Sequence, residues 1–199
     1  MKLPLLITAA ALLAVGAYAL TSTTVQDKKT QEAGAGKDQM IPAWMRPGEQ
    51  HKLLAAHAGS WDFKMKWTDP STGEGATTGK SDMKMIFDGR YLEDLTQSSF
   101  QGMAFEGRGF TGFDMIKKKF VTTWFDSMST GLAVFEGTYD AASKSLSFTG
   151  EMPDMTGKYV KSRIVQKWTD NDHFTSTFFM PGPDGKETTH MVIEYTRAK

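Results

Sequence analysis

The residues with the most obvious chemical potential form a glycine-rich segment in the middle of the chain. The run from Gly107 to Gly112, GRGFTG, matches the G-x-G-x-x-G spacing of dinucleotide-binding loops. In those loops the glycines let the backbone approach a pyrophosphate, which lies at the N-terminus of the following helix. The spacing therefore predicts a nucleotide site only where a strand comes before it and a helix after it.

The residues after these glycines predict a β-hairpin instead of a helix. Asp114 can initiate a turn by bonding its own backbone, lysines follow at 117–119, and a strand is expected from Phe120 to Ser127. The same turn signature, with an aromatic residue followed by Asp, recurs from Tyr139 to Leu146. We therefore interpret the glycines as residues that permit strand coiling and close backbone approach, not as a phosphate cradle.

Other residue types that carry catalysis fall into no known motif. The sequence has no G-x-S-x-G turn, no H-E-x-x-H, no Walker loop and no cysteine. Scattered groups could still meet in space, for example Asp126 with Glu136 or His173. His51 and His57 are six residues apart, which is not the i, i+4 spacing of helical metal ligands, so packing roles are favoured. These observations disfavour an enzyme without excluding one, and they predict no catalytic residue, metal or cofactor.

Composition and charge describe a chain that can bury one sizeable core. Of its 199 residues, 40% are hydrophobic and 12% aromatic, while 23 basic residues balance 23 acidic ones. A chain of this length favours one domain. Because it has no basic stripe beyond the hairpin tip at 117–119, we expect no nucleic-acid partner.

The N-terminal 45 residues predict export rather than fold. Residues 1–19 combine Lys2, an apolar run and a small-x-small ending at Ala17 and Ala19, which is typical of a cleaved signal peptide. The alternative is an uncleaved membrane anchor. Residues 20–45 lack any apolar period and are expected to be a flexible spacer. The mature protein is therefore expected to be periplasmic or extracellular, with no stable membrane insertion after cleavage.

Residues 46–199 predict an all-β domain. A short helix is expected from Pro47 to about Ala58, with Leu53, Leu54 and His57 facing inward as a plug. After Gly59 the apolar residues alternate with polar ones, as they do in strands with one buried face. About ten such strands separated by tight turns favour an antiparallel up-and-down β-barrel, with the helix capping one end.

Several short motifs in this region resemble a known bacterial family. They are Gly59-Ser60-Trp61-Asp62, Phe105–Gly109, Lys118-Lys119-Phe120 with Trp124, Phe135–Asp140 and Pro181–Lys186. From about Pro47 to Lys199 the chain is similar to the domain of unknown function numbered 1579. The resemblance implies a calycin-like, lipocalin-resembling barrel that is often exported, and it implies no established activity.

The Gly-Ser-Trp opening also resembles, more distantly, the haem-binding barrels called nitrobindins. Their haem-ligating histidine lies at the start of the last strand, where this chain has His190. The glycine-rich continuation after their tryptophan is replaced here by Asp62–Met65. In addition, Met191, Ile193 and Tyr195 form the apolar face of the last strand, so His190 would need a one-residue slip in register to point inside.

Alternation also predicts which side chains line the barrel interior. In the central hairpin the face is ambiguous, because Glu106, Arg108 and Phe110 share one face while Trp124 shares the other with Asp126. Arg108 either lies inside, where it could hold a carboxylate, or forms an ion pair with Glu106 outside. The candidate ligand-binding residues are the walls Trp67, Met85, Trp124 and Phe178 and the polar anchors Arg108, Gln166 and Ser176.

Barrels of this size either fill with side chains or hold one small ligand. The leading hypothesis is an exported protein that binds a small, mostly apolar molecule without catalysis. The alternative is a structural or protein-interaction module whose barrel is filled and whose surface is apolar. A lesser alternative is a haem-binding barrel that uses His190.

Overall fold

The computed structural model describes residues 41–69, 73–100, 102–154 and 156–199. The predicted signal peptide and residues 20–40 of the predicted spacer lie outside the described residues. Pro42–Lys199 forms one compact unit, which begins with a short 3-10 helix, η1 (Ala43–Met45), and an α-helix, α2 (Glu49–Ala55). Within the described residues, no helix has the length and apolar character needed to cross a membrane.

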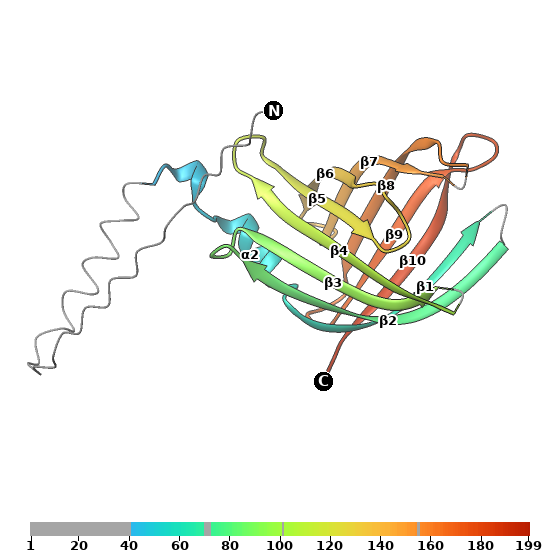
Figure 1. Cartoon of the computed structure of the whole chain (residues 1–199). Coiled ribbons are helices and arrows are strands. Elements are labelled where there is room, and N and C mark those ends of the chain that lie inside the picture. The colour runs from blue at the N-terminus through green and yellow to red at the C-terminus, as the bar shows by residue number, and fades with distance from the viewer. Residues whose placement is uncertain (1–40, 70–72, 101, 155) are drawn as a thin grey trace, which may run out of the picture. The chain divides into compact units, whose positions relative to one another are not determined.

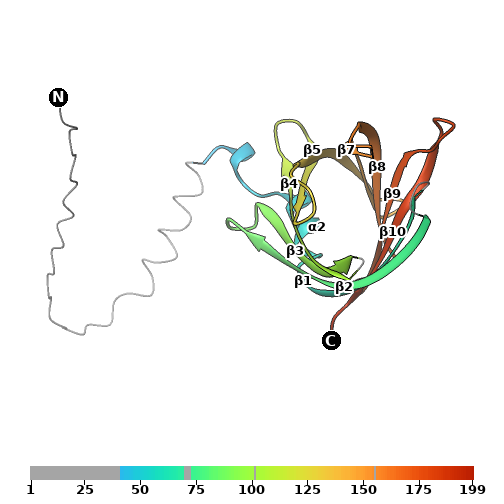
Figure 2. The ribbon, with the colours of Figure 1, turned by 45° about the vertical axis from the view of Figure 1, so that its right-hand side comes forward.

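Ten antiparallel strands follow the helix and close into a barrel (Figure 1). They are β1 (Gly59–Asp69), β2 (Gly73–Ile86), β3 (Tyr91–Phe100), β4 (Met103–Asp114), β5 (Lys119–Asp126), β6 (Ala133–Asp140), β7 (Ser145–Pro153), β8 (Tyr159–Trp168), β9 (His173–Pro181) and β10 (Glu187–Arg197). Each strand pairs with its neighbours in the chain, and β1 pairs with β10 from Trp61↔Arg197 to Trp67↔Met191. Figure 2 shows the strands as a ring. The predicted up-and-down barrel is confirmed.

The helix is shorter than the sequence predicted, and it caps one end of the barrel as expected. It packs against β2, β3 and β4, and it buries Leu54, while His57 just beyond its end is buried as well. His51 is buried at its first turn, where its Nδ1 accepts a hydrogen bond from the Gly48 amide at 2.9 Å. This bond satisfies one of the amides that a helix N-terminus leaves free.

Arg197, at the end of β10, ties this plug to the barrel. Its guanidinium donates to the carbonyl oxygens of Ala56 (3.1 Å) and Ala58 (2.9 Å) and lies 4.2 Å from the centre of the Trp61 ring. The indole N–H of Trp61 in turn donates to the carbonyl oxygen of His57 at 2.9 Å. The end of the barrel covered by α2 is therefore closed by specific bonds as well as by packing; we call it the closed end.

The core lies at the closed end and consists mainly of aromatic rings from the inward faces of the strands. Phe174 stacks on Tyr195 with ring centroids 4.2 Å apart and meets Trp61 edge-on at 4.9 Å. Burying each large apolar side chain of this kind contributes about 1.5–3 kcal/mol. The buried apolar residues of this cluster are Leu54, Trp61, Phe63, Met83, Leu92, Phe120, Phe135, Leu146, Phe148, Ile164, Phe174, Ile193 and Tyr195.

Glycines in the strands make room for aromatic rings from the neighbouring strand. A Cβ on Gly107 would overlap the Trp124 ring, and one on Gly109 would lie 3.2 Å from Cε3 of the same ring. The third glycine of the motif, Gly112, faces Tyr91 in the same way, at 2.6 Å from its Cδ1. The G-x-G-x-x-G run is thus a strand segment against which rings pack, and strand β5 follows it instead of a helix.

The two hairpin turns with the repeated signature are built as predicted. Asp114 Oδ1 accepts the amides of Ile116 (2.8 Å) and Lys117 (2.9 Å), and Asp140 Oδ1 accepts the amide of Ala142 (3.0 Å). The two amide bonds lower the pKa of Asp114, while the Ser143 hydroxyl, which donates to Asp140 Oδ2 at 2.6 Å, and the Ala142 amide lower the pKa of Asp140. These carboxylates therefore initiate turns.

Candidate functional site

Many side chains on the inward face of the barrel remain half-buried, in contrast to the core at the closed end. In a closed barrel, an inward-facing side chain stays accessible only where it borders space inside the barrel or at its mouth. Two groups of such residues lie on opposite walls. The first wall is Met65 and Trp67 of β1, Met191 of β10 and Phe178 of β9; the second wall is Asp94 of β3, Thr111 of β4, and Thr122 and Trp124 of β5.

The first wall is apolar. Trp67, Met191 and Phe178 are cross-strand neighbours on β1, β10 and β9. The Trp67 ring lies 5.1 Å from that of Phe100, and it also covers Gly75, where a Cβ would overlap it. This wall offers dispersion contacts and no charge.

The second wall combines an aromatic ring with polar groups. Thr111 and Thr122 share a hydrogen bond of 2.9 Å between their hydroxyl oxygens. The indole N–H of Trp124 donates to Asp126 Oδ2 at 3.0 Å, and Asp126 Oδ1 accepts the Met128 amide at 3.0 Å. Both oxygens of Asp126 are therefore in use.

Asp94 is the second carboxylate on the inward face. Its Oδ1 accepts hydrogen bonds from the hydroxyls of Ser81 (2.6 Å) and Thr96 (3.0 Å). Desolvation raises the pKa of Asp94, which the two hydroxyl bonds partly offset. Burial, aided by the charge of Asp94, also raises the pKa of the Tyr195 phenol. Burial therefore makes a charge on Asp94 costly, and a cation beside the carboxylate would offset that cost.

Six of the seven candidate ligand-binding residues lie on inward-facing strand positions. Trp67, Trp124 and Phe178 belong to the two walls, and Gln166 is half-buried beside the buried Ser176, its cross-strand neighbour. Met85 also faces inward, and like Phe178 it packs against the buried core cluster.

Arg108 is the exception: of the two placements that the sequence left open, the structure has the outer one, so the predicted role of Arg108 as an interior anchor is wrong. Gly107 and Gly109 face inward under Trp124, so Arg108 between them points outward, where its side chain is 46% exposed. Its guanidinium lies 3.9 Å from carboxylate oxygens of both Glu93 and Glu106. The outer ion pair is therefore the correct alternative, and Arg108 cannot anchor a ligand in the interior.

His190 occupies an irregular position on β10. The pairing with β9 shifts between Thr189 and Met191, so His190 is the extra residue of a β-bulge and has no cross-strand partner among the described residues. Met191, Ile193 and Tyr195 keep the inward face that the sequence predicted.

The carboxylates and histidine weighed for catalysis are not brought together. Asp126 faces inward at the end of β5, whereas Glu136 lies outside and pairs with Lys117 (2.8 Å) and Lys119 (3.0 Å). His173 is exposed and contacts Asp170. Among the described residues, no three His, Asp or Glu side chains cluster in a way that could hold a metal ion.

Two features were not predicted from the sequence: the interior position of Asp94 and the unpaired ring nitrogens of His57. Asp94 shares a face with Leu92 and Thr96, and this alternation was the available signal, but Glu93 and Leu95 make the opposite face equally mixed. His57 was expected to pack inward, yet its chemistry was missed. Neither of its ring nitrogens has a hydrogen-bond partner in the described structure, and burial lowers its pKa from 6.5 to about 4.

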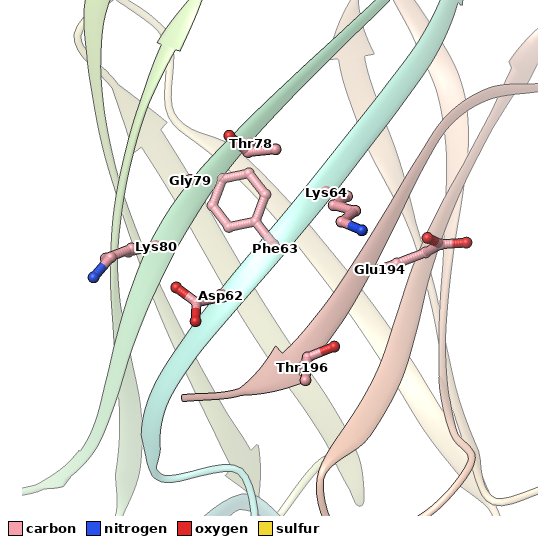
Figure 3. Close-up of a pocket in the computed structure, with 8 residues that line it drawn as sticks. All are labelled: Asp62, Phe63, Lys64, Thr78, Gly79, Lys80, Glu194 and Thr196. Atoms are coloured by element: carbon pink, nitrogen blue, oxygen red, sulfur yellow. The ribbon is translucent and has the colours of Figure 1, made fainter. Parts of the chain in front are cut away.

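Two hollows lie on the outer wall. One, of about 410 Å³, spans β10, β1 and β2 and carries charged side chains of both signs, including Asp62, Lys64 and Glu194 (Figure 3). In the same view the Phe63 ring lies toward Gly79. The other, of about 530 Å³, lies over β7 and β8 and includes Arg163, which binds Glu187 through two hydrogen bonds. Both hollows are open and mixed in charge, which does not favour an apolar ligand.

Comparisons with known proteins agree with this fold. The profile of a family described as "Protein of unknown function (DUF1579)" matches residues 46–197. The crystal structure of Rv2717c from M. tuberculosis is similar, with a TM-score of 0.57 and 11% identity, over 77% of this chain and 100% of that chain. A de novo designed fluorescence-activating β-barrel has a TM-score of 0.42 and 16% identity, over 73% of this chain and 97% of that one. No curated protein matches the sequence. At such identities the likeness to Rv2717c shows the fold alone.

Proposed function

Because the chain belongs to the DUF1579 family, whose function is unknown, its role must be inferred from its own interior, and we propose that the barrel binds a small, mostly apolar molecule there. The observation that carries this proposal is the contrast between buried and half-buried inward-facing side chains. Trp61 and Phe148 are 1% exposed in the core, whereas Trp67, Trp124 and Phe178 are half-buried although they face inward. Aromatic walls with a few polar groups are typical of small-molecule sites.

Binding of an uncharged apolar dye tests the proposal. N-phenyl-1-naphthylamine fluoresces weakly in water and strongly in apolar surroundings, so the purified protein should increase its emission in a saturable manner. Replacing inward-facing Thr122 by Trp should fill the interior and abolish the increase. Replacing Thr138, an exposed residue of β6, by Trp is the matched control and should leave it unchanged.

Two results would contradict binding in the interior. The first is no saturable fluorescence with the wild-type protein, which would favour a filled barrel that acts through its surface. The second is equal loss of fluorescence in the variants at 122 and 138, which would place the dye elsewhere. Circular dichroism of each variant should match the wild type, so that unfolding is not mistaken for loss of a site.

We also propose that the protein is exported and works in the periplasm or outside the cell. The support is the apolar run of residues 1–19 with its small-x-small ending. Expression of the full chain in a bacterial host should give a mature protein whose N-terminus is Leu20. Recovery of the intact chain in the membrane fraction would instead support an uncleaved anchor.

The haem alternative can be tested separately through His190. Haemin added to the wild type should produce a shifted Soret band that is lost in His190→Ala if this residue is a ligand. A wild-type spectrum equal to that of free haemin would exclude the alternative. The apolar-ligand proposal does not depend on this outcome.

A further inference from the structure

Asp94 is a carboxylate on the barrel interior, and no cation from the described residues lies beside it. Of the described inward-facing strand positions, Arg197 at the closed end is the one basic residue, and it is bonded to the carbonyl oxygens of Ala56 and Ala58. The polar partners of Asp94 are the neutral hydroxyls of Ser81 and Thr96. Buried carboxylates in proteins are normally paired with a cation or held by several donors.

The two oxygens of Asp94 differ in their surroundings. Oδ1 accepts both hydroxyl bonds, whereas no donor from the described part of the chain reaches Oδ2. Asp126, the other inward-facing carboxylate, has a donor on each oxygen. Asp94 therefore keeps an acceptor available to a ligand, and Asp126 does not.

Trp124 supplies an aromatic ring on β5, on the far side of β4 from Asp94. Gly109 is the cross-strand partner of both Asp94 on β3 and Trp124 on β5. Because Gly109 has no side chain, the Trp124 ring lies against it, with Cε3 and Cζ3 at 3.2 and 3.6 Å from where a Cβ would be. Nothing but a glycine backbone separates the carboxylate from the ring along this line of the sheet.

We propose that Asp94 and Trp124 together recognise the ammonium group of a small organic amine whose apolar part lies between the two walls. This inference rests on the proposed function, because it needs an interior that admits a ligand. It extends that function by naming the ligand class as cationic, and not anionic or neutral.

A carboxylate beside an aromatic ring is a physically sound ammonium site. An ammonium over a Trp face is attracted by the ring quadrupole, and a hydrogen bond to an ionised carboxylate adds a charge-assisted contact. Both contacts strengthen where water is excluded. A carboxylate ligand would be repelled by Asp94 and Asp126. Among the described strand positions the one inward-facing basic residue is Arg197, which is already bonded at the closed end.

Three probes with one carbon skeleton test the charge preference. 3-Phenylpropan-1-amine, 3-phenylpropan-1-ol and 3-phenylpropanoate are each titrated against protein loaded with N-phenyl-1-naphthylamine at pH 7.5. The amine should displace the dye at a concentration about tenfold lower than the alcohol requires, since two charge-dependent contacts are gained. The carboxylate should be the weakest of the three.

Removing the charge of Asp94 should abolish this preference and preserve dye binding. In Asp94→Asn the amide oxygen can still accept from Ser81 and Thr96, and the amine-to-alcohol ratio should fall to within about threefold of unity. Asp62→Asn is the matched control, because Asp62 is exposed on the outer face of strand β1. It should retain the wild-type ratio.

The outcomes separate this inference from the proposed function. Absence of dye binding in the wild type contradicts both. Dye binding with no amine preference, or with a preference that survives Asp94→Asn, overturns the ammonium site alone. If Asp94→Asn does not fold, Trp124→Leu decides the question: a reduced amine-to-alcohol ratio supports the site, and an unchanged ratio overturns it.

Discussion

His57 should make the barrel progressively less stable as the pH falls below neutral. Its ring lies 4.1 Å from the Trp168 ring and 5.8 Å from the Phe174 ring, between centroids, and neither nitrogen has a hydrogen-bond partner in the described structure. Burial lowers its pKa from 6.5 to about 4, the nearby Arg197 adds to the shift, and carbonyl groups of Leu53 and Leu54 partly offset it. Protonation of this ring in the folded barrel is therefore costly.

The sign and size of the effect follow from proton linkage. Because the folded pKa lies below the unfolded one, the unfolded state binds the proton more tightly, so the stability present above pH 6.5 is lost as the pH falls toward 4. The loss should reach about 2 kcal/mol at pH 5 and about 3 kcal/mol at pH 4. His51, whose pKa is also lowered, acts in the same direction.

Urea unfolding at pH 7.5 and pH 5.0, followed by tryptophan fluorescence, measures this loss. His57→Phe keeps a ring between Trp168 and Phe174 but cannot be protonated, so it should reduce the difference between the two pH values by about 2 kcal/mol. At pH 7.5 its stability should lie within about 1 kcal/mol of the wild type, because a ring without hydrogen bonds is replaced by an apolar ring.

His173→Gln is the control for this experiment, since His173 is exposed. It should retain the pH dependence of the wild type. If His57→Phe and the wild type lose the same stability between pH 7.5 and pH 5.0, the reasoning about His57 is refuted. Circular dichroism before unfolding checks that each variant starts from the folded barrel.

Three other substitutions test how the barrel is built. Gly107→Ala should displace the Trp124 ring and lower the free energy of urea unfolding by about 2 kcal/mol. Adding Trp124→Leu to the same chain should recover part of that loss. Equal stability of Gly107→Ala and the wild type would contradict the ring packing. Arg197→Ala should lower the stability of the protein by about 2 kcal/mol, because α2 loses its bonds to the barrel. The amides of residues 49–58 should then exchange hydrogen faster. Unchanged exchange would show that packing alone holds the helix. Asp114→Ala should lower the melting temperature more than Asp114→Asn, which keeps an acceptor for the turn amides; equal melting temperatures would argue against the turn role.

Local sequence determined the strands and the turns. Alternation fixes which residues share a face, because successive side chains in a strand point to opposite sides. Asp114 and Asp140 bond amides two or three residues away, so their turns need no distant partner. The same locality explains why Leu54 and His57 were correctly placed as a plug, although the helix begins and ends closer in than predicted.

Alternation could not decide which face of the central hairpin is inside. Gly107 and Gly109 contribute no side chain to their own face, so alternation left open whether that face or the one with Arg108 and Phe110 is inside. The tertiary structure decides through Trp124, whose ring fills the space that the glycines leave. The pairing of β4 with β5 thus turned Arg108 outward, and no property of residues 107–112 alone contains that information.

By itself, the sequence determined an all-β barrel with a helical plug, since periodicity and turn chemistry are local properties of the chain. Only the tertiary structure decided what the interior contains. Closure of the barrel pairs Trp61 with Arg197, which lie at opposite ends of the domain sequence. Strand register makes Gly109 the partner of both Asp94 and Trp124. The chemistry of the interior depends on such cross-strand neighbours, because burial and a nearby ring, not residue type, set what a carboxylate or an imidazole can bind.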